Sequence, residues 1–448
     1  MFSRVLVANR GEVAVRVIRA LHELGCEAVA VYSTADEDAT FVRMADRALR
    51  IGPPAAAKSY LRIPSLIAAA TTTGCEAVHP GWGFLAENPA FARACEENDL
   101  VFVGPPPDVM ARMGDKAQAK HEMRESGVPL VPGTEGTATV EQARAAVAEL
   151  GLPVLLKAAA GGGGKGMRLV ESPHELEDAF GSAAAEAEAA FGDPHLYVEK
   201  VIHPARHVEV QVLADAEGRV LTLGDRECSI QRRHQKVIEE SPSPALTPQA
   251  REEMEAAAER AAKRIGYTNA GTFEFLVDPG GSFYFIELNA RLQVEHPLSE
   301  LCTGIDIVHE QLRIAAGQPL TLTGRAPRRG HAIEIRINAE DPQRNFTPMP
   351  GVIRRFRPPL GPGVRVDTAV EDGSVVPPYY DSLIAKVIVW DADRPAAIAR
   401  AVRALGELEV EGVPTTREAA LEILQTDEFA SGDYSTTFLE ERYAAVAS

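Results

Sequence analysis

The first 32 residues read as a strand, a helix and a second strand, and this order constrains the fold more than any other feature. Arg4 to Ala8 form the β-branched run RVLVA, which is typical of a buried strand, and Ala28 to Tyr32 form a second apolar run. Between them, from Glu12 to Leu24, apolar residues recur at helical spacing, and Gly25 ends the helix. Parallel strands joined in this way need helical cover, so the sequence predicts an α/β unit at its start.

Length and charge set the broad class. A chain of 448 residues with 45% apolar side chains has material for two or three domains. The formal net charge of -18 argues against a nucleic-acid partner, because a phosphate backbone is held by clustered Lys and Arg. Any phosphate ligand is therefore expected to be small.

The cysteines and the first residues predict a cytoplasmic location. Five cysteines are scattered without a CxxC pair, so neither a disulfide framework nor a thiolate zinc site is indicated. The apolar run within Met1 to Gly11 is too short for a signal sequence or a membrane span. We therefore expect no membrane association.

A second unit is expected to begin between residues 115 and 135. Lys116 to Gly127 has a helical pattern, and Pro129 to Thr137 is rich in Pro and Gly, as a linker would be. The strand Pro153 to Ala158 then leads into the glycine run Gly161 to Gly166, which is followed by the strand Met167 to Val170.

The glycine run is neither a Rossmann fingerprint nor a P-loop. A strand follows it where a Rossmann motif needs a helix, and Gly166 stands where a P-loop needs Ser or Thr. A strand, a glycine tip and a strand predict a hairpin whose backbone N-H groups approach phosphate oxygens, although a plain flexible turn is the alternative. Lys157, at the end of the apolar strand, would be costly to bury without an anion, unless its stem extends to solvent.

Two carboxylates are predicted to face each other on a later hairpin. If Gly280 and Gly281 are the central residues of a two-residue turn between strands within Thr272 to Asn289, Glu274 lies opposite Glu287. Like charges in opposed positions are destabilising unless a cation lies between them. Mg²⁺ fits this sparse set, with Asn289 as a further oxygen ligand, whereas a solvated polar face is the alternative.

Two polar clusters flank this hairpin. The segment RECSIQRRHQKVIEE, residues 226–240, concentrates basic side chains within an acidic protein, and NARLQVEH, residues 289–296, adds a second group. A lone basic run is usually a solvated face, but two such clusters beside a predicted metal hairpin favour an anion-handling active site.

The chain resembles the biotin carboxylase family of ATP-grasp enzymes over nearly its whole length. The resemblance rests on NRGEVAVR (9–16), HPGWGFLAEN (79–88), MGDK (113–116), DRECSIQRRHQK (225–236), ELNARLQVEHPLSE (287–300) and RINAEDP (336–342). One departure is Ala159-Ala160, where Ser-Gly is common in the family, and it bears on the motion of the glycine hairpin.

The resemblance implies an α/β and α+β architecture with three units. These are a Rossmann-like pre-ATP-grasp domain at 1–114, an ATP-grasp domain at 115–317 whose flap spans about 131–203, and a biotin carboxylase C-terminal domain at 330–440.

The resemblance also implies ATP and metal ligands. The phosphates would meet Lys116, Lys157, Gly163 and Gly164, and two Mg²⁺ or Mn²⁺ ions would be held by Glu274, Glu287 and Asn289. The remaining nucleotide-binding residues would be Glu199, Lys200, Val201, Ile202, His207, Gln231 and His234.

A catalytic set is implied in the same way. Bicarbonate would be held by Lys236, Arg291, Gln293 and the backbone of Val294. Glu295 would be the general base that removes the bicarbonate proton, so that the γ-phosphate of ATP is attacked and carboxyphosphate forms. Arg336 would stabilise the biotin anion that captures CO₂, completing a catalytic group of Glu295, Arg291, Arg336 and Lys236.

The expected partners are a biotin carboxyl carrier protein, carboxyltransferase subunits and a second copy of the chain. No Met-Lys-Met-type biotin attachment site occurs in the sequence, so biotin is expected to arrive on another polypeptide. Acetyl-CoA carboxylase in fatty acid synthesis is the expected context, with propionyl-CoA or pyruvate carboxylase as alternatives. Another ATP-grasp ligase, or a silent ATP-binding regulatory subunit, is a further alternative.

Overall fold

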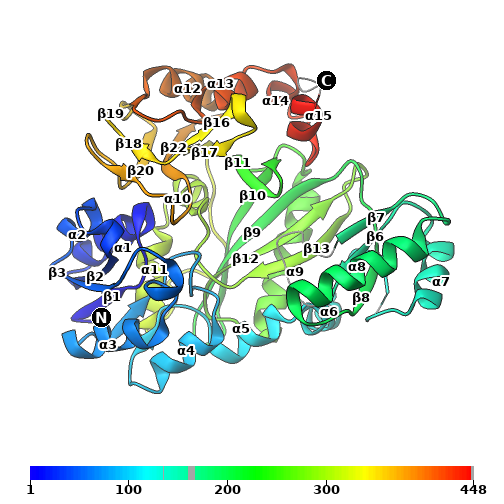
Figure 1. Cartoon of the computed structure of the whole chain (residues 1–448), viewed down its shortest axis with the longest axis horizontal. Helices are drawn as coiled ribbons and strands as arrows, with labels where there is room; N and C mark the ends of the chain where they lie inside the picture. Colours follow the sequence, from blue (N-terminus) through cyan, green and yellow to red (C-terminus); the bar gives the residue numbers. More distant parts are fainter. Residues whose placement is uncertain (135, 160–166, 445–448) are drawn as a thin grey trace.

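The structure is a computed structural model that describes residues 1–134, 136–159 and 167–444. Three regions stand out in Figure 1: an N-terminal unit, a central sheet that continues into the C-terminal part, and a projecting lobe. The predicted phosphate-binding glycines Gly163 and Gly164 lie outside the described residues.

The N-terminal unit is built on a parallel sheet, as the opening of the sequence predicts. Strand β1 leads through helix α1 to β2, and the five strands pair in the order β3-β2-β1-β4-β5. Each pairing is parallel. The bounds are β1 Arg4–Val7, α1 Gly11–Glu23, β2 Glu27–Ser33, α2 Thr40–Met44, β3 Arg47–Gly52, α3 Ile63–Thr73, β4 Ala77–His79, α4 Pro89–Glu96, β5 Val101–Phe102 and α5 Pro107–Gly114.

The central sheet is extended by strands from the C-terminal part of the chain. Its strands follow the order β13-β12-β9-β10-β11-β15-β22-β20, with β14 beside β10, so one hydrogen-bonded sheet continues into the C-terminal part. The junction is the antiparallel pair β11 and β15. The bounds are β9 Arg206–Ala214, β10 Val220–Arg232, β11 Gln235–Ser241, β12 Asn269–Val277, β13 Phe283–Asn289, β14 Gly324–Arg325, β15 His331–Asn338, β20 Val364–Thr368 and β22 Leu383–Asp391.

Helices cover this sheet. The segment before α10 crosses the polar face of the sheet, and α12 packs on the strands of the C-terminal part. None of the helices in the described ranges is both long and apolar enough to cross a membrane. The bounds are α6 Lys116–Glu125, α9 Pro248–Ile265, α10 His296–Thr303, α11 Ile307–Ala315, α12 Arg394–Glu407, α13 Arg417–Leu424, α14 Asp427–Ser431 and α15 Phe438–Ala444.

The projecting lobe has its own small sheet. Strands β6 Val154–Ala158 and β7 Met167–Val170 are antiparallel, which confirms the predicted pairing of strands around the glycine run. Strand β8 Leu196–Lys200 pairs with the other edge of β6, and helices α7 Val140–Leu150 and α8 Leu176–Phe191 pack on this sheet. No ladder among the described strands joins this lobe to the central sheet.

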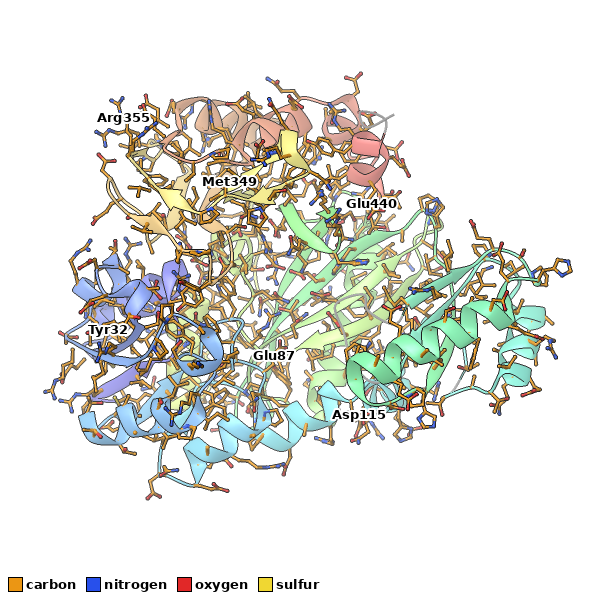
Figure 2. The ribbon with its side chains drawn as sticks, viewed as in Figure 1. Tyr32, Glu87, Asp115, Met349, Arg355 and Glu440 are labelled. Carbon is orange, nitrogen blue, oxygen red and sulfur yellow. The ribbon has the colours of Figure 1, made fainter. Side chains whose placement is uncertain are left out.

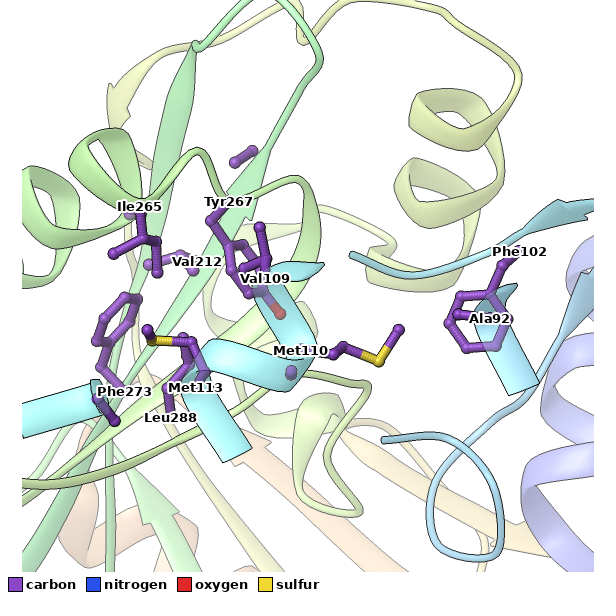
Figure 3. Close-up of a cluster of buried hydrophobic side chains, with 14 of the residues drawn as sticks. Ala92, Phe102, Val109, Met110, Met113, Val212, Ile265, Tyr267, Phe273 and Leu288 are labelled. Carbon is purple, nitrogen blue, oxygen red and sulfur yellow. The ribbon is translucent and has the colours of Figure 1, made fainter. Parts of the chain in front are cut away.

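The N-terminal unit and the central sheet share one hydrophobic core. Met110 and Met113 of α5 are buried in the same cluster as Phe273 and Leu288 of the central hairpin, as Figure 3 shows. Truncating a buried Met to Ala typically costs about 2 to 5 kcal/mol. This packing fixes the N-terminal unit against the sheet that bears the candidate site, whereas Figure 2 shows polar side chains such as Glu440 and Arg355 at the periphery.

The central hairpin confirms one part of its prediction and corrects another. Glu274 lies opposite Glu287, as predicted. The predicted two-residue turn is wrong, because the backbone N-H of Asp278 bonds to Ser282 O at 2.9 Å and closes a longer loop. The register shifts by one between Phe275 and Glu274, where Ile286 is the extra residue, and this β-bulge restores the predicted pairing.

Candidate active site

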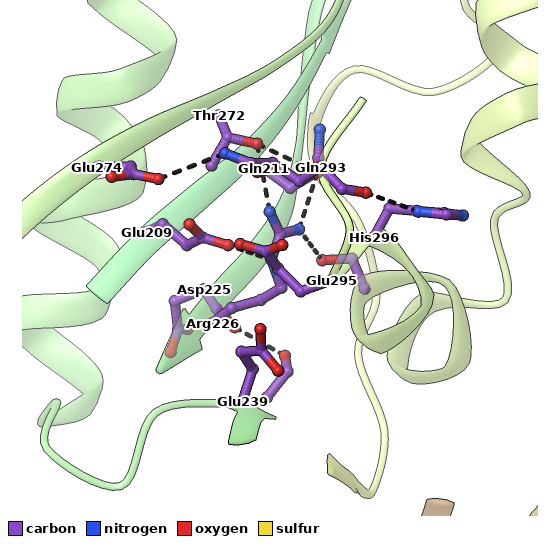
Figure 4. A network of polar contacts seen from close by, with 12 residues as sticks. Glu209, Gln211, Asp225, Arg226, Glu239, Thr272, Glu274, Gln293, Glu295 and His296 are labelled. Carbon is purple, nitrogen blue, oxygen red and sulfur yellow. Dashed lines mark hydrogen bonds and ion pairs between the residues drawn. The ribbon is translucent and has the colours of Figure 1, made fainter. Parts of the chain in front are cut away.

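The candidate site lies on the polar face of the central sheet. On β9, residues His207, Glu209 and Gln211 alternate with valines that enter the hydrophobic core, so the three polar side chains share one face. All three are buried. Figure 4 shows side chains from β10, β11, β12 and the segment that precedes α10 completing this face. Strands β13 and β15 contribute further side chains to it.

Arg226 organises the floor of the site. Its guanidinium is fully buried and donates to Glu209 Oε1 at 2.6 Å, to Gln211 Oε1 at 2.8 Å and to Ser299 Oγ at 2.9 Å. Buried charges are tolerated when they are paired and hydrogen-bonded in this way. Arg226 therefore holds Glu209 in a fixed position beneath the predicted catalytic residues.

Lys236 joins three carboxylates from different segments. Its ammonium donates to Glu209 at 2.7 Å, to Glu274 at 3.1 Å and to Glu295 at 2.5 Å. Burial alone would lower the pKa of Lys236, but the thiol of Cys228 and the three carboxylates raise it well above its ordinary value. Lys236 is therefore a permanent cation at the centre of the site.

Glu295 lies between two cations. Besides the contact with Lys236, its Oε2 accepts a hydrogen bond from Arg336 Nη2 at 3.0 Å, and the side chain is fully buried. Burial alone would raise the pKa of Glu295, but Lys236 and Arg336 hold it well below its ordinary value. Arg336 also donates from Nε to Glu239 at 2.6 Å. Glu295 is therefore an ionised carboxylate, as a proton acceptor must be.

Arg291 links the predicted bicarbonate residues to the hairpin. It donates to Gln293 Oε1 at 2.9 Å and to Asn289 Oδ1 at 2.9 Å, and Gln293 Nε2 donates to Glu274 at 3.3 Å. Its Nε also bonds to Glu87 of the N-terminal unit at 2.8 Å. The backbone carbonyl of the predicted residue Val294 accepts from the buried Lys386 at 2.9 Å.

The predicted metal ligands lie together, with differing environments. Glu274 Oε2 lies 3.0 Å from His207 Nε2, and although burial opposes it, Lys236 and His207 lower the pKa of Glu274. Glu287 reaches solvent, while desolvation and repulsion from Glu274 raise its pKa. Two opposed carboxylates, one of them open to solvent, fit a divalent cation with few protein ligands. The oxygen of Asn289, however, faces Arg291.

The predicted phosphate lysines meet at the base of the lobe. Lys157 Nζ lies 2.5 Å from Glu199 Oε2, and Lys120, which the sequence analysis missed, donates to the other oxygen of Glu199. Burial and the neighbouring charge of Lys157 lower the pKa of Lys116. Two lysines that repel each other form a favourable site for an anion.

The other predicted nucleotide residues lie in different surroundings. Gln231 is buried and pairs with Lys236 across β10 and β11, whereas His234 is exposed at the turn between these strands. Lys200 donates to the carbonyls of Gly151 and Leu152 and so points toward the loop before β6. Val201 and Ile202 follow β8 in a segment without regular structure.

Sequence reasoning missed several buried polar side chains. Glu209 and Gln211 stand in HVEVQV, and Glu334 stands two residues before the predicted Arg336 in HAIEIRIN, where polar residues alternate with β-branched ones. In a central strand this alternation signals a buried polar face. Lys386, in the apolar run LIAKVIVW, could have been found by the rule that a buried lysine needs partners.

Three family models match successive parts of the chain. They are described as "Biotin carboxylase, N-terminal domain" (residues 1–110), "Carbamoyl-phosphate synthase L chain, ATP binding domain" (115–323) and "Biotin carboxylase C-terminal domain" (334–441). A biotin carboxylase from Nostoc sp. is 52% identical over 442 residues, covering 98% of this chain and 99% of that protein. The chain belongs to the biotin carboxylase family.

Solved biotin carboxylase structures agree with this family. One from Campylobacter jejuni, named as a complex with "beta-gamma-ATP", is 46% identical with a TM-score of 0.95, covering 98% of this chain and 99% of that chain. The biotin carboxylase domain dimer of Hydrogenobacter thermophilus 2-oxoglutarate carboxylase is named as a complex with MgADP, ADP and bicarbonate. It is 48% identical with a TM-score of 0.94, covering 99% of this chain and 98% of that chain.

A pyruvate carboxylase subunit from Methanothermobacter thermautotrophicus is also similar, at 51% identity over 98% of this chain and 90% of that protein. The biotin carboxylase assignment confirms the predicted ATP-grasp architecture with its two flanking units, and the predicted activity of an ATP-dependent ligase. It sets aside the alternatives of a different ATP-grasp ligase and of a silent regulatory subunit.

Proposed function

We propose that this biotin carboxylase performs the first half-reaction of acetyl-CoA carboxylase, carboxylating biotin on a separate carrier protein with bicarbonate and ATP. The observation that carries the proposal is the position of Glu295, a buried carboxylate with Lys236 at 2.5 Å on one oxygen and Arg336 at 3.0 Å on the other. Glu295 is thus a proton acceptor between two cations. Lys236 is suited to binding bicarbonate, and Arg336 is suited to stabilising a ureido anion.

Bicarbonate is held between Lys236 and Arg291, with Gln293 and the backbone of Val294 completing its contacts. Support comes from their shared network through Glu274 and from the Lys386 bond that fixes the Val294 peptide. Glu295 removes the bicarbonate proton, which makes the bicarbonate oxygen a better nucleophile toward the γ-phosphate of ATP. Carboxyphosphate is the product of this transfer.

ATP binds between the lobe and the central sheet. Lys116 and Lys157 meet its phosphates, together with Gly163 and Gly164. The base and ribose are met by the residues Glu199, Lys200, Val201, Ile202, His207, Gln231 and His234. The contact of Lys157 with Glu199 supports this placement, because a triphosphate offers Lys157 a stronger anionic partner.

Glu274, Glu287 and Asn289 would hold Mg²⁺ or Mn²⁺, as two ions next to the ATP phosphates. The bound metal would neutralise phosphate charge during the transfer. The opposed carboxylates of the hairpin support this assignment. For Asn289 to contribute its oxygen, that oxygen has to be shared with Arg291.

Arg336 acts in the second step. Carboxyphosphate yields CO₂ and phosphate, the phosphate removes the N1 proton of biotin, and Arg336 stabilises the negative charge that develops on the ureido oxygen. Its place on β15, inside the central sheet, and its two carboxylate partners fix the guanidinium in position.

The partners are a biotin carboxyl carrier protein, carboxyltransferase subunits and a second copy of this chain, in the cytoplasm. The dimer named for the Hydrogenobacter thermophilus domain supports self-association. The similarity to a protein of pyruvate carboxylase keeps pyruvate as the second candidate acceptor. We also propose the domain division 1–114, 115–317 with a flap at about 131–203, and 330–440.

The test is phosphate release from Mg-ATP by the purified chain, with and without bicarbonate and biotin, together with detection of carboxybiotin. Release that depends on bicarbonate and is accelerated by biotin is expected. ATP turnover that is indifferent to bicarbonate would contradict the proposal. Reconstitution with carrier and carboxyltransferase, offering acetyl-CoA, propionyl-CoA or pyruvate, decides the acceptor.

A further inference from the structure

Two buried glutamates face each other next to Arg336. Glu239 on β11 is the register partner of Glu334 on β15, and both side chains are fully buried. Paired residues on adjacent strands place their Cβ atoms about 5 Å apart on the same face of a sheet. Two ionised carboxylates in this position would repel each other strongly, because the surroundings exclude water.

The two carboxyl groups are not equally supplied with partners. Glu239 Oε1 accepts from Arg336 Nε at 2.6 Å, and Glu239 Oε2 has no hydrogen-bond partner among the described residues. Within the same described set, neither oxygen of Glu334 accepts a hydrogen bond. On its other side Glu334 faces Ile388 of β22, so no cation lies opposite it on either neighbouring strand.

The nearby cations are already engaged. Lys386 donates to the Val294 carbonyl at 2.9 Å and pairs with Glu12 at 3.2 Å and with Asp367 at 3.5 Å. Arg336 is shared between Glu239 and Glu295. The charged groups that act on the pair from β11, β15, β22 and the segment before α10 are Lys236, Arg336, Lys386 and Glu295.

We propose that Glu334 is a positioning residue that still holds a proton slightly above neutral pH, where Glu239 is the ionised carboxylate that orients Arg336. The proposal rests on the proposed role of Arg336 toward biotin. Of the two acids, Glu239 ionises first because Arg336 donates to it, and Glu334 keeps its proton because nothing compensates its charge. The pair therefore titrates as a unit.

The electrostatics of the pair agree with the geometry. Burial raises the pKa of Glu334 well above its ordinary value, against the attraction of Lys386, and repulsion from Glu239 adds to the rise. Burial also raises the pKa of Glu239 to about 7, while Arg336 opposes that rise. Loss of the Glu334 proton would add a third negative charge to those of Glu239 and Glu295 near Arg336 and hold the guanidinium back from the biotin anion.

The first experiment detects the proton without any assay of activity. Infrared spectra of the wild-type chain and of Glu334→Gln are compared slightly above neutral pH, where Glu239 is ionised, in the carbonyl region of protonated carboxyl groups. We expect one protonated carboxyl to disappear in Glu334→Gln and to persist in Glu239→Gln. Identical spectra of wild type and Glu334→Gln, or loss of the signal in Glu239→Gln but not in Glu334→Gln, would overturn the assignment.

The second experiment measures kcat and KM for biotin against pH. As pH rises, the infrared signal of the protonated Glu334 carboxyl disappears in wild type. Over that range kcat/KM of wild type should fall relative to kcat/KM of Glu334→Gln, by about tenfold per pH unit. A ratio that stays constant would show that the proton has no bearing on Arg336. If Glu334→Gln misfolds, Glu334→Met gives the same comparison without a titrating group.

Failure of this inference is distinct from failure of the proposed function. A chain that carboxylates biotin but lacks the Glu334 carboxyl signal would refute only the inference. A chain that shows the signal but forms no carboxybiotin would refute only the proposed function.

Discussion

Glu295 and Arg336 are joined by a 3.0 Å hydrogen bond from Nη2 to Oε2, although they come from different segments of the chain. The proposed proton acceptor for bicarbonate and the proposed anion-stabilising group for biotin are therefore in direct contact. A proton on Glu295 removes one of the two carboxylate charges that hold Arg336, so the two half-steps are electrostatically connected.

Glu295→Gln should retain ATP binding and lose roughly 10² to 10⁴-fold in bicarbonate-dependent turnover, because the amide is nearly isosteric and cannot accept the proton. ATP affinity and steady-state phosphate release provide the measurement. Glu310→Gln, on α11 and outside the predicted catalytic set, serves as the control for the loss of one carboxylate. Near-normal turnover would remove Glu295 from the role of general base.

Glu274→Gln and Glu287→Gln should each raise the Mg²⁺ concentration needed for half-maximal activity, while the fold is kept because a like-charge repulsion is relieved. Activity is titrated against Mg²⁺ at fixed ATP, and thermal unfolding checks the fold. Glu253→Gln, exposed on α9, is the matched control. An unchanged Mg²⁺ requirement in both hairpin variants would make the hairpin purely structural.

Arg336→Ala should slow carboxylation far more than it weakens ATP binding, with free biotin and with a biotinylated carrier alike, since both acceptors develop the same ureido charge. The carrier should act at much lower concentration than free biotin, because its protein surface adds positioning and effective concentration. Carboxybiotin formation is measured for both acceptors, with the exposed Arg344→Ala as control. Equal rates in wild type and Arg336→Ala would defeat the assignment.

Glu240 should make stability depend on acid pH. Burial opposes its ionisation, but hydrogen bonds from His331 and Arg394 bring its pKa down to about 2, from an ordinary value of 4.5. Since the folded pKa lies below the unfolded one, this contribution is complete above pH 4.5 and is lost as pH falls toward 2. The contribution of the ionised Glu240 to the free energy of unfolding amounts to about 3 kcal/mol.

Glu240→Gln should therefore lower Tm at neutral pH and flatten the dependence of Tm on pH on the acid side. Thermal unfolding across this range provides the measurement, with the exposed Glu428→Gln as control. If the Tm of Glu240→Gln falls as steeply as that of wild type when the pH is lowered, other acidic groups dominate the loss of stability at acid pH.

The sequence predicted the α/β opening and the paired strands around the glycine run, because each depends on local periodicity. The opposition of Glu274 and Glu287 was predicted from an assumed two-residue turn. The turn of the central hairpin was mispredicted. Its longer loop and the bulge at Ile286 shift the register in opposite senses, and sequence alone could not show that the two shifts cancel.

The buried charges behind the predicted residues were not found. Family resemblance pointed to Lys236, Arg291 and Glu295, but Arg226, Glu334 and Lys386 act through neighbours that are distant in sequence. Their surroundings depend on the order of strands in the sheet, which periodicity does not give. The pairing of β11 with β15, in particular, follows from no local signal.

The continuity of the central sheet limits how the chain can be divided. Family models separate at residues 323 and 334, yet the backbone of β11, Gln235–Ser241, is hydrogen-bonded to β15, His331–Asn338, across that boundary. Cutting the chain there would leave an open strand edge of N-H and C=O groups, which is a template for pairing with other chains. The two segments are separable in sequence but share one sheet, and a truncated ATP-grasp unit would need another strand beside β11 to avoid pairing with other chains through that edge.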